Sequence, residues 1–357
     1  MNIDKMTGKK IILFGAGKYG KMALNHFGLD KVHCFADNHT YGHMVNSKIV
    51  ISFDSLCQMH YDYDVVISVH EDMHDDIEEQ CKANNINYFL YHDVVFPSYN
   101  DYKSDPSIRQ FQKKHLNKRC FLIGNGPSLK PEDLSLLHEN KEITFACNAI
   151  SEIFPYTNWR PKYFATQDTV FFQHQAEMLA ETDAEFKFFP ILEKTYINDD
   201  DNNDEFFRIL TRGKGTYFFI KVVKPFLRAA MPLFSPDLSK AMYWGATVMY
   251  LMMQLATFMG FSKIYLLGVD GGFGTQLDHE KYLSEKQHFY DENDGWMQQF
   301  KDTYKPHVTE NFIKTRVDKA YSAAEHYTKQ NGIKIYNATR GGRIQVFERV
   351  EFDSLFS

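Results

Sequence analysis

The sequence predicts an α/β protein with two domains, each containing a mainly parallel, doubly wound sheet. Short apolar runs alternate with helical segments along most of the chain, an alternation typical of parallel sheets with crossover helices. A glycine-rich turn follows the first apolar run of each half, at Gly15 and at Gly124. The 357 residues, of which 44% are hydrophobic and 24% charged, are enough for two cores.

Four apolar runs in the first hundred residues predict strands, and the segments between them predict helices. The strands are expected at Lys10–Phe14, Val32–Ala36, Asp64–Val69 and Asn87–Tyr91, and the helices at Lys21–Phe27 and Glu71–Asn84. We therefore expect an N-terminal domain over residues 1–97. Residues 98–118 contain Pro, Ser, Asn, Asp and a cluster of lysines, which predicts a linker with a short connecting helix.

The remaining residues, 119–357, repeat the pattern and predict the larger domain. A helix is expected to begin at Pro131, because proline and then two acids suit a helix N-terminus. The strands are expected at Cys120–Ile123, Ile143–Cys147, Tyr163–Ala165, Ile264–Val269 and Ile333–Asn337, and the helices at Pro131–His138, Tyr243–Met259 and Ile313–Gln330.

Charge and cysteine usage exclude several classes of protein. The net charge of -6 argues against a nucleic-acid partner held by overall charge. The five cysteines are scattered, odd in number and without a C-x-x-C pair, so neither a disulfide framework nor a zinc site is expected. No apolar run reaches the roughly 20 residues that span a bilayer. We expect a cytoplasmic protein without a signal peptide.

The first glycine turn matches G-x-G-x-x-G directly after a strand, through Gly15, Gly17 and Gly20. In such a loop the glycines permit the turn, the approach of a phosphate and the packing of helix on strand. Asp37 ends the next strand, where an acid binds a ribose hydroxyl. Two interpretations stay open: a nucleotide-binding loop, or a scaffold that resembles the small Rossmann-like modules of bacterial polysaccharide enzymes.

The second glycine turn, Gly124-Asn125-Gly126-Pro127-Ser128, is the most specific stretch of the sequence. Asn125 offers an amide to a sugar or base, and Ser128 can cap the next helix or bind phosphate. Asn148 stands at the end of the following strand. Ligands bind at this edge of an open α/β sheet, so the two asparagines predict a nucleotide-sugar pocket.

From about Cys120 onward, the sequence resembles two related families. The shared segments are Gly124–Ser128, Lys162–Gln173, Gly245–Val248, Gly260–Asp270 and Ile333–Thr339. One family is the bacterial sialyltransferases that use CMP-sialic acid; the other is the 6-hydroxymethylpterin diphosphokinase-like family, which includes flagellin nonulosonate transferases. The resemblance implies a GT-A-like Rossmann fold for residues 119–357.

The resemblance to the sialyltransferases also implies roles for individual residues. Asn125, Asn148 and Gln167 match positions near the donor nucleotide, and Asp270 matches the acid of the Gly-x-Asp strand. The tyrosines that follow this acid in the family are replaced here by a glycine-rich stretch, so Tyr282 or Tyr290 is expected to hold the donor phosphate. The expected nucleotide-binding set is completed by Gly124, Gly126, Ser128, Asp168 and Thr247.

Transfer to an acceptor hydroxyl needs a base, and two histidines compete for this role. His288 lies in Gln-His-Phe-Tyr, which is similar to the Ser-His-Tyr of the family, whereas His307 fits by position. Arg340 and Arg343 flank two glycines at a strand end, where guanidinium groups bind a phosphate or carboxylate. The alternative is a turn with solvated arginines.

The predicted function is a glycosyltransferase of polysaccharide biosynthesis. It would transfer a sugar, such as a nonulosonic acid, from a CMP-linked donor to a glycan or lipid-linked acceptor, with no metal required. The alternative is a pyrophosphokinase that needs ATP and Mg²⁺; a further alternative is a non-enzymatic nucleotide-sugar sensor. Phe218–Phe234 predicts a buried helix pair, or else a peripheral contact with the inner face of the membrane. We also expect a homo-oligomer.

Overall fold

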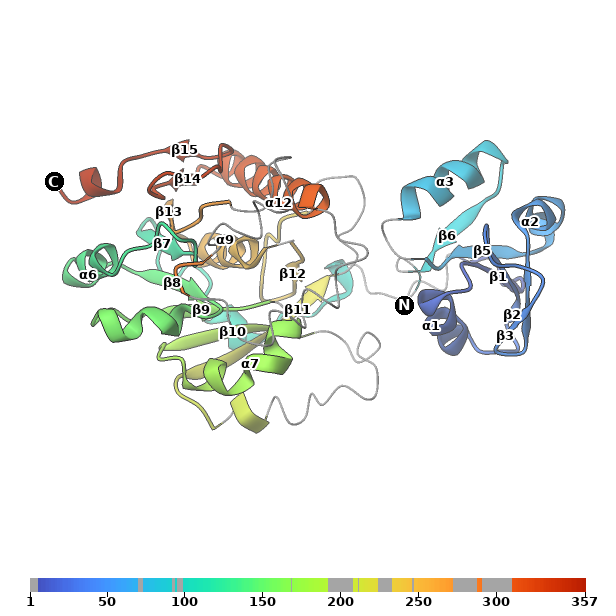
Figure 1. The fold of residues 1–357 in the computed structure, drawn as a ribbon, viewed down its shortest axis with the longest axis horizontal. Helices are drawn as coiled ribbons and strands as arrows, with labels where there is room; N and C mark the ends of the chain where they lie inside the picture. The colour runs from blue at the N-terminus through green and yellow to red at the C-terminus, as the bar shows by residue number, and fades with distance from the viewer. Residues whose placement is uncertain are drawn as a thin grey trace. The chain divides into compact units, whose positions relative to one another are not determined.

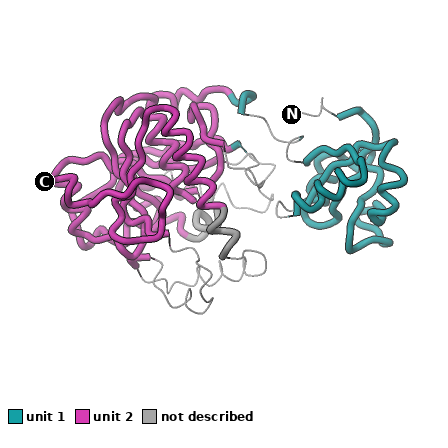
Figure 2. Tube along the Cα trace, turned by 90° about the horizontal axis from the view of Figure 1, so that it is seen from above, with its two compact units in different colours: residues 1–102, 223–230 teal, residues 103–222, 231–357 magenta. Residues whose placement is uncertain are grey.

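A computed structural model describes residues 6–69, 73–91, 94, 99–167, 169–191, 208–210, 212–223, 233–245, 247–271, 288–290 and 310–357. The chain divides into two compact units (Figure 2). Unit 1 comprises residues 1–102 with 223–230, and unit 2 comprises residues 103–222 with 231–357.

Unit 1 is built on a six-stranded sheet, as far as the structure describes it, in the order β3-β4-β2-β1-β5-β6. All neighbouring strands are parallel except β3 and β4. From the central β1 the chain adds β2, β3 and β4 on one side and then β5 and β6 on the other. The direction in which strands are added therefore reverses between β1 and β5. The strands are β1 (Ile11–Phe14), β2 (Val32–Ala36), β3 (Met44–Val45), β4 (Lys48–Ile51), β5 (Asp64–Ile67) and β6 (Tyr88–Leu90), and the helices are α1 (Lys18–Phe27), α2 (Phe53–Met59), α3 (His74–Ala83) and the short 3-10 turns His60–Asp62 and Tyr99–Asp101.

Unit 2 contains, within the described ranges, a nine-stranded sheet in the order β12-β11-β10-β9-β8-β7-β13-β14-β15 (Figure 1). All the strand pairs of this sheet whose residue register is defined are parallel. The strands are β7 (Arg119–Ile123), β8 (Thr144–Cys147), β9 (Tyr163–Ala165), β10 (Phe186–Ile191), β11 (Thr216–Val223), β12 (Met242–Tyr243), β13 (Lys263–Leu267), β14 (Lys334–Asn337) and β15 (Glu348–Arg349). The helices are α5 (Pro106–Arg109), α6 (Pro131–Glu139), α7 (Thr169–Glu181), α9 (Val248–Phe258) and α12 (Glu310–Gln330), with 3-10 segments at Ile150–Tyr156 and Phe352–Leu355.

The sheet of unit 2 separates two apolar layers. Successive side chains of a strand point to opposite faces, so Cys120 and Leu122 of β7 enter one layer while Phe121 and Ile123 enter the other. The helices α9 and α12 pack together over the first layer (Figure 1). Both faces of the central strands are therefore covered, which explains their continuous apolar sequences.

A lysine side chain lies inside this core. Lys187 of β10 is fully buried, and its ammonium donates to the carbonyl oxygens of Leu179 and Ala180, each at 2.8 Å. These carbonyls belong to the last turn of α7, where backbone acceptors have no partner within the helix. Lys187 therefore serves as an internal cap for α7.

The predicted α/β class with mainly parallel sheets is confirmed. The short helix expected within residues 98–118 is present as α5. Residues 106–118 pack on the rest of unit 2, where Phe111 is fully buried and the backbone of residues 113–117 bonds to residues 258–260. One local expectation is wrong. The apolar run that starts at Phe218 forms strand β11, not a helix; its remainder after Val223 lies largely outside the described residues.

Candidate functional site

The sheet of unit 2 has its topological switch point at β7. The chain passes from β7 through β8, β9 and β10 on one side, and later adds β13, β14 and β15 on the other. The loops that follow β7 and β13 thus leave the carboxyl edge in opposite directions, and in open α/β sheets ligands bind in the crevice between such loops. The glycine turn at 124–128 and the segment 268–271 occupy this position.

The glycines of the two loops are required by their close approach. A Cβ at Gly124 would lie 2.5 Å from the carbonyl oxygen of Gly268, and a Cβ at Gly268 would lie 2.8 Å from that of Gly124. A Cβ at Gly126 would overlap the carboxylate of Asp270. The two predicted motifs therefore form one structure, in which the backbone of each loop packs directly on the other.

Side-chain amides link the strand ends on the other side of β7. The Nδ2 of Asn125 donates to the carbonyl oxygen of Cys147 at 3.0 Å. The Oδ1 of Asn148 accepts from the hydroxyl of Thr166 at 2.7 Å, and the Nε2 of Gln167 donates to the carbonyl oxygen of Gly245 at 2.6 Å. Asn148 adopts a left-handed backbone, with φ of 49°, which asparagine tolerates better than most residues.

Two of these amides leave an acceptor unused. Asn125 and Gln167 are 7% and 5% exposed, and among the described residues neither Asn125 Oδ1 nor Gln167 Oε1 has a hydrogen-bond partner. Their orientation is fixed, because each NH₂ group faces a carbonyl oxygen that only a donor satisfies. A buried acceptor without a partner is costly. The two oxygens therefore need donors that the described residues do not supply, and a bound ligand can supply them.

Ser128 of the loop after β7 and Asp270 of the loop after β13 form a pair. The hydroxyl of Ser128 donates to Asp270 Oδ2 at 2.9 Å. Burial raises the pKa of Asp270 above its ordinary value, although the hydrogen bonds from Ser128 act in the other direction. Asp270 is thus a partly desolvated acid that can accept hydrogen bonds from a bound hydroxyl.

The segment 288–290 is attached to the glycine loop. The amide of Phe289 donates to the carbonyl oxygen of Asn125 at 3.0 Å. The rings of His288 and Tyr290 stack, with centroids 4.9 Å apart and planes inclined by 12°. The structure thereby brings His288 and Tyr290 to the strand end that carries Asn125. The other predicted residues of this group, Asp168, Tyr282 and His307, lie outside the described residues.

Thr247 has a local structural role. Its hydroxyl accepts from the amide of Met249 at 3.3 Å and so caps the N-terminus of α9. It also interacts with the phenol of Tyr321 on α12, whose pKa is raised by burial and lowered by this hydrogen bond. Thr247 therefore connects α9 with α12 near Gly245.

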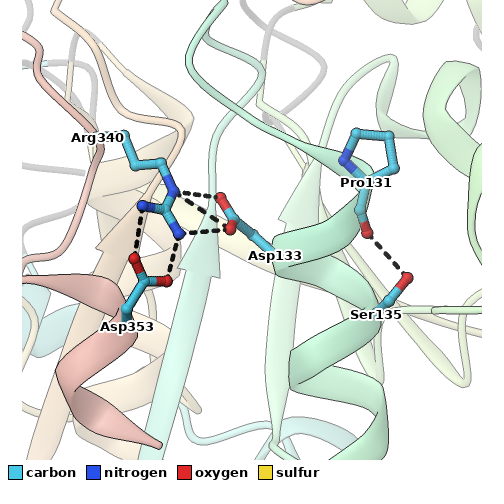
Figure 3. A network of polar contacts seen from close by, with 5 residues as sticks. All are labelled: Pro131, Asp133, Ser135, Arg340 and Asp353. Carbon is cyan, nitrogen blue, oxygen red and sulfur yellow. Dashed lines mark hydrogen bonds and ion pairs between the residues drawn. The ribbon is translucent and has the colours of Figure 1, made fainter.

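Arg340 is paired with two acids. Its guanidinium binds the carboxylates of Asp133 and Asp353 on two sides, with the Nη2 to Asp133 Oδ1 distance at 2.8 Å and the Nη1 to Asp353 Oδ2 distance at 3.0 Å (Figure 3). The hydrogen bonds to Asp133, and next those to Asp353, raise the pKa of Arg340 above its ordinary value. These two acids occupy most of the N–H donors of Arg340, and its binding to a donor phosphate or carboxylate stays a prediction.

The loop that Arg340 begins supports the acid of the site. The amide of Arg343 donates to the carbonyl oxygen of Asp270 at 2.7 Å, and a Cβ at Gly342 would lie 3.1 Å from the Cα of Asp270. Gly342 has a φ of 78°, which favours glycine. The backbone of Arg343 thus adjoins Asp270, its side chain is exposed, and binding of that side chain to a phosphate or carboxylate stays a prediction.

The glycine loop of unit 1 is largely satisfied by its own structure. A Cβ at Gly15 would lie 2.7 Å from the carbonyl oxygen of Ser68, and one at Gly20 would overlap that of Gly15, whereas nothing described lies within 4 Å of a Cβ at Gly17. Asp37 accepts from the amides of Ala16, His39 and Thr40. Its carboxylate holds the loop together, and nucleotide binding by this loop stays a prediction.

Two searches of the described residues give negative results. No group of three or more His, Cys, Asp or Glu side chains is arranged to hold a metal ion. No helix in the described ranges is both long and apolar enough to cross a bilayer.

Sequence reasoning missed the partners that hold the site residues. Thr166, which positions the Asn148 amide, precedes Gln167 directly, and its place at a strand end was a usable signal. The pairing of Asp133 with Arg340 spans 207 positions, and no local pattern indicates it.

Comparison with known proteins provides a family. A family model described as "6-hydroxymethylpterin diphosphokinase MptE-like" matches residues 95–276, half of the chain. The solved structure of MAf glycosyltransferase from Magnetospirillum magneticum AMB-1 is similar at 12% identity and a TM-score of 0.43. That alignment covers 97% of this chain and 58% of the other. Comparison with curated proteins gives no match.

Proposed function

Because the chain belongs to the 6-hydroxymethylpterin diphosphokinase MptE-like family, we propose that it is a transferase that uses a nucleotide-linked, phosphate-containing donor. The donor is a CMP-linked sugar such as a nonulosonic acid, and the acceptor is a glycan hydroxyl of a surface polysaccharide. The crevice between the loops that follow β7 and β13 is the donor site.

The unpaired oxygens of Asn125 and Gln167 are the observation that carries this proposal. Both are acceptors, so the bound group presents hydrogen-bond donors, and a phosphate does not. The exocyclic amino group of cytosine and the hydroxyls of ribose are such donors. A nucleoside therefore fits the side of Asn125 and Gln167, and the phosphate fits the side of Ser128 and Tyr290.

His288 is the proposed general base. Its imidazole takes the proton of the acceptor hydroxyl while that oxygen forms a bond to the anomeric carbon of the donor. The bond between this carbon and the phosphate oxygen breaks, and CMP leaves with the electron pair. The hydroxyl of Tyr290 donates to the leaving phosphate as its charge develops, while the hydroxyl of Ser128 stays bonded to Asp270.

The family description favours a second function, the transfer of diphosphate from ATP to a small alcohol. This reaction would use Mg²⁺ held by carboxylates, for which Asp168 and Asp270 are the proposed ligands. The amino group of adenine also matches the unpaired acceptors. The two functions therefore differ in their nucleotide and in their need for a metal.

Thermal unfolding with CMP, CDP, UDP, GDP, ATP or NAD, each with and without Mg²⁺, separates these functions. A ligand at 100 times its Kd stabilises the folded protein by about 2.7 kcal/mol. We expect CMP to stabilise without Mg²⁺ and UDP to have little effect, because uracil lacks the amino group. Stabilisation by ATP that requires Mg²⁺, without a response to CMP, would establish the pyrophosphokinase instead.

Substitution of the two amides tests the site itself. Asn125→Leu and Gln167→Met remove the unpaired oxygens with little change in side-chain size, so we expect the CMP-dependent shift to disappear while the unliganded protein stays folded. Asn140→Leu, at the exposed end of α6, is the matched control and should keep the full shift. A normal response to CMP in both site variants would exclude this crevice as the nucleoside site.

A further inference from the structure

The amino edge of the unit 2 sheet, where the parallel strands begin, carries a row of lysines. Lys118 immediately precedes β7, and Lys263 and Lys334 are the first residues of β13 and β14. Lys263 and Lys334 are register partners. The backbone amide of Ser262 donates to the carbonyl oxygen of Lys118 at 2.9 Å, and the backbone amide of Lys334 donates to the carbonyl oxygen of Ser262 at 3.0 Å. Lys263 and Lys334 are thus held on adjacent strands, whose spacing is about 4.8 Å, and Lys118 lies one residue before Arg119, the register partner of Lys263 on β7.

The turn before β7 extends this row and adds an apolar side chain. Its backbone is fixed to the end of α9, because the amides of Lys113 and His115 donate to Phe258 and Met259. Within the turn His115 is buried, and Lys113, Lys114, Asn117 and Lys118 are exposed. Leu116 is 57% exposed between these lysines.

Several lysines of this edge take part in no ion pair among the described residues. Two carboxylates of the edge, Glu142 and Glu185, are ion-paired with Arg119 and Lys162 respectively. In the part of the chain that the structure describes, Lys113, Lys118, Lys263 and Lys334 form no ion pair. Because the whole chain has a net charge of -6, this positive surface is local.

We propose that Lys113, Leu116, Lys118, Lys263 and Lys334, the amino-edge patch, bind the surface of an anionic lipid bilayer. Lysines are attracted to anionic headgroups, and an apolar side chain among them enters the boundary between headgroups and acyl chains. A nucleic acid would complement the charge but offers no place for Leu116. This binding directs the carboxyl edge, with the crevice, away from the bilayer.

Vesicle co-sedimentation of the full chain tests this assignment. We expect binding to phosphatidylcholine vesicles that contain about 30% phosphatidylglycerol, weak binding to pure phosphatidylcholine, and release between about 0.1 M and 1 M salt. The double variant K118E/K334E should weaken partition by at least about 25-fold, since each lysine contributes about fivefold, or about 1 kcal/mol. Leu116→Ser should weaken it several-fold at constant charge.

K21E/K31E is the matched control, because both lysines are exposed in unit 1 and the change in net charge is the same. It should bind vesicles like the parent chain. Equal loss in the two double variants, or equal binding to neutral and anionic vesicles, would refute the patch. Binding to a DNA duplex together with no binding to anionic vesicles would also refute it, in favour of a nucleic-acid partner.

Discussion

The two units use the same device, a glycine turn after a central strand at a switch point, but they differ in what it leaves unsatisfied. In unit 1 the acid Asp37 accepts from three backbone amides of its own domain. In unit 2 the amides of Asn125 and Gln167 keep buried oxygens that no described residue satisfies. Close approach of backbones thus explains the glycines of both loops, whereas the two oxygens in unit 2 still need donors.

The two units also differ in how they hold a charged side chain. Asp37 is an acid whose pKa is lowered in the folded state: burial raises it, but hydrogen bonds from His39, Thr40 and Ala16 more than offset this. Lys187 is a base whose pKa burial lowers to about 8. The two groups make the stability of each unit depend on pH over separate ranges.

The glycines of unit 1 provide the largest expected effect. Gly20→Ala places a methyl group on the carbonyl of Gly15, so we expect a loss of about 4 kcal/mol in the unfolding free energy of unit 1. Gly17→Ala meets no described atom and should cost at most about 1 kcal/mol, the cost of a poorer helix cap. Denaturant unfolding of both variants measures the difference. Equal costs would show that the motif is not maintained by packing.

Lys187 should make unit 2 more stable at alkaline pH. Its pKa is about 8 when folded and near 10.5 when unfolded, so between these values only the unfolded state keeps the proton. The unfolding free energy should therefore rise by about 3 kcal/mol from pH 8 to pH 10.5. The same pH profile measured on Lys187→Met gives the contribution of all other titrating groups. The rise due to Lys187 should be absent from that variant. Parallel pH profiles of the two proteins would contradict the assignment.

Asp37→Asn should have the smallest effect and decides between two roles. If the carboxylate only holds the loop, its replacement costs about 1 kcal/mol at pH 7. The parent should lose this contribution as the pH falls through the lowered pKa of Asp37, and the variant should not. Asp30→Asn, at an exposed position, is the control. An unchanged stability with a loss of nucleotide binding would instead assign Asp37 to a ribose.

Strand order explains why part of the site could be predicted from sequence. Asn125, Asn148 and Gln167 each follow an apolar run, and parallel strands bring all such positions to one edge. The ion pairs of Arg340 could not be predicted, because no local pattern links it to Asp133 in α6 or to Asp353. The run from Phe218 was misassigned because a short apolar segment fits a buried helix and a buried strand equally well. In unit 1, α2 begins so soon after β4 ends that the sequence pattern predicted neither the strand nor the helix.

The position of β7 between β8 and β13 also determines when the crevice can form. The bond between Ser262 and Lys118, at the start of the β7–β13 pair, joins residues 144 positions apart. The loop-closure entropy of this contact must be overcome before the pair gains any stability, and such contacts slow folding. We therefore expect β7 to pair with β8 first and to acquire β13 late. A partly folded chain would then have Asn125 in place and lack Asp270, so the ability to bind a nucleotide would appear only in the last step of folding.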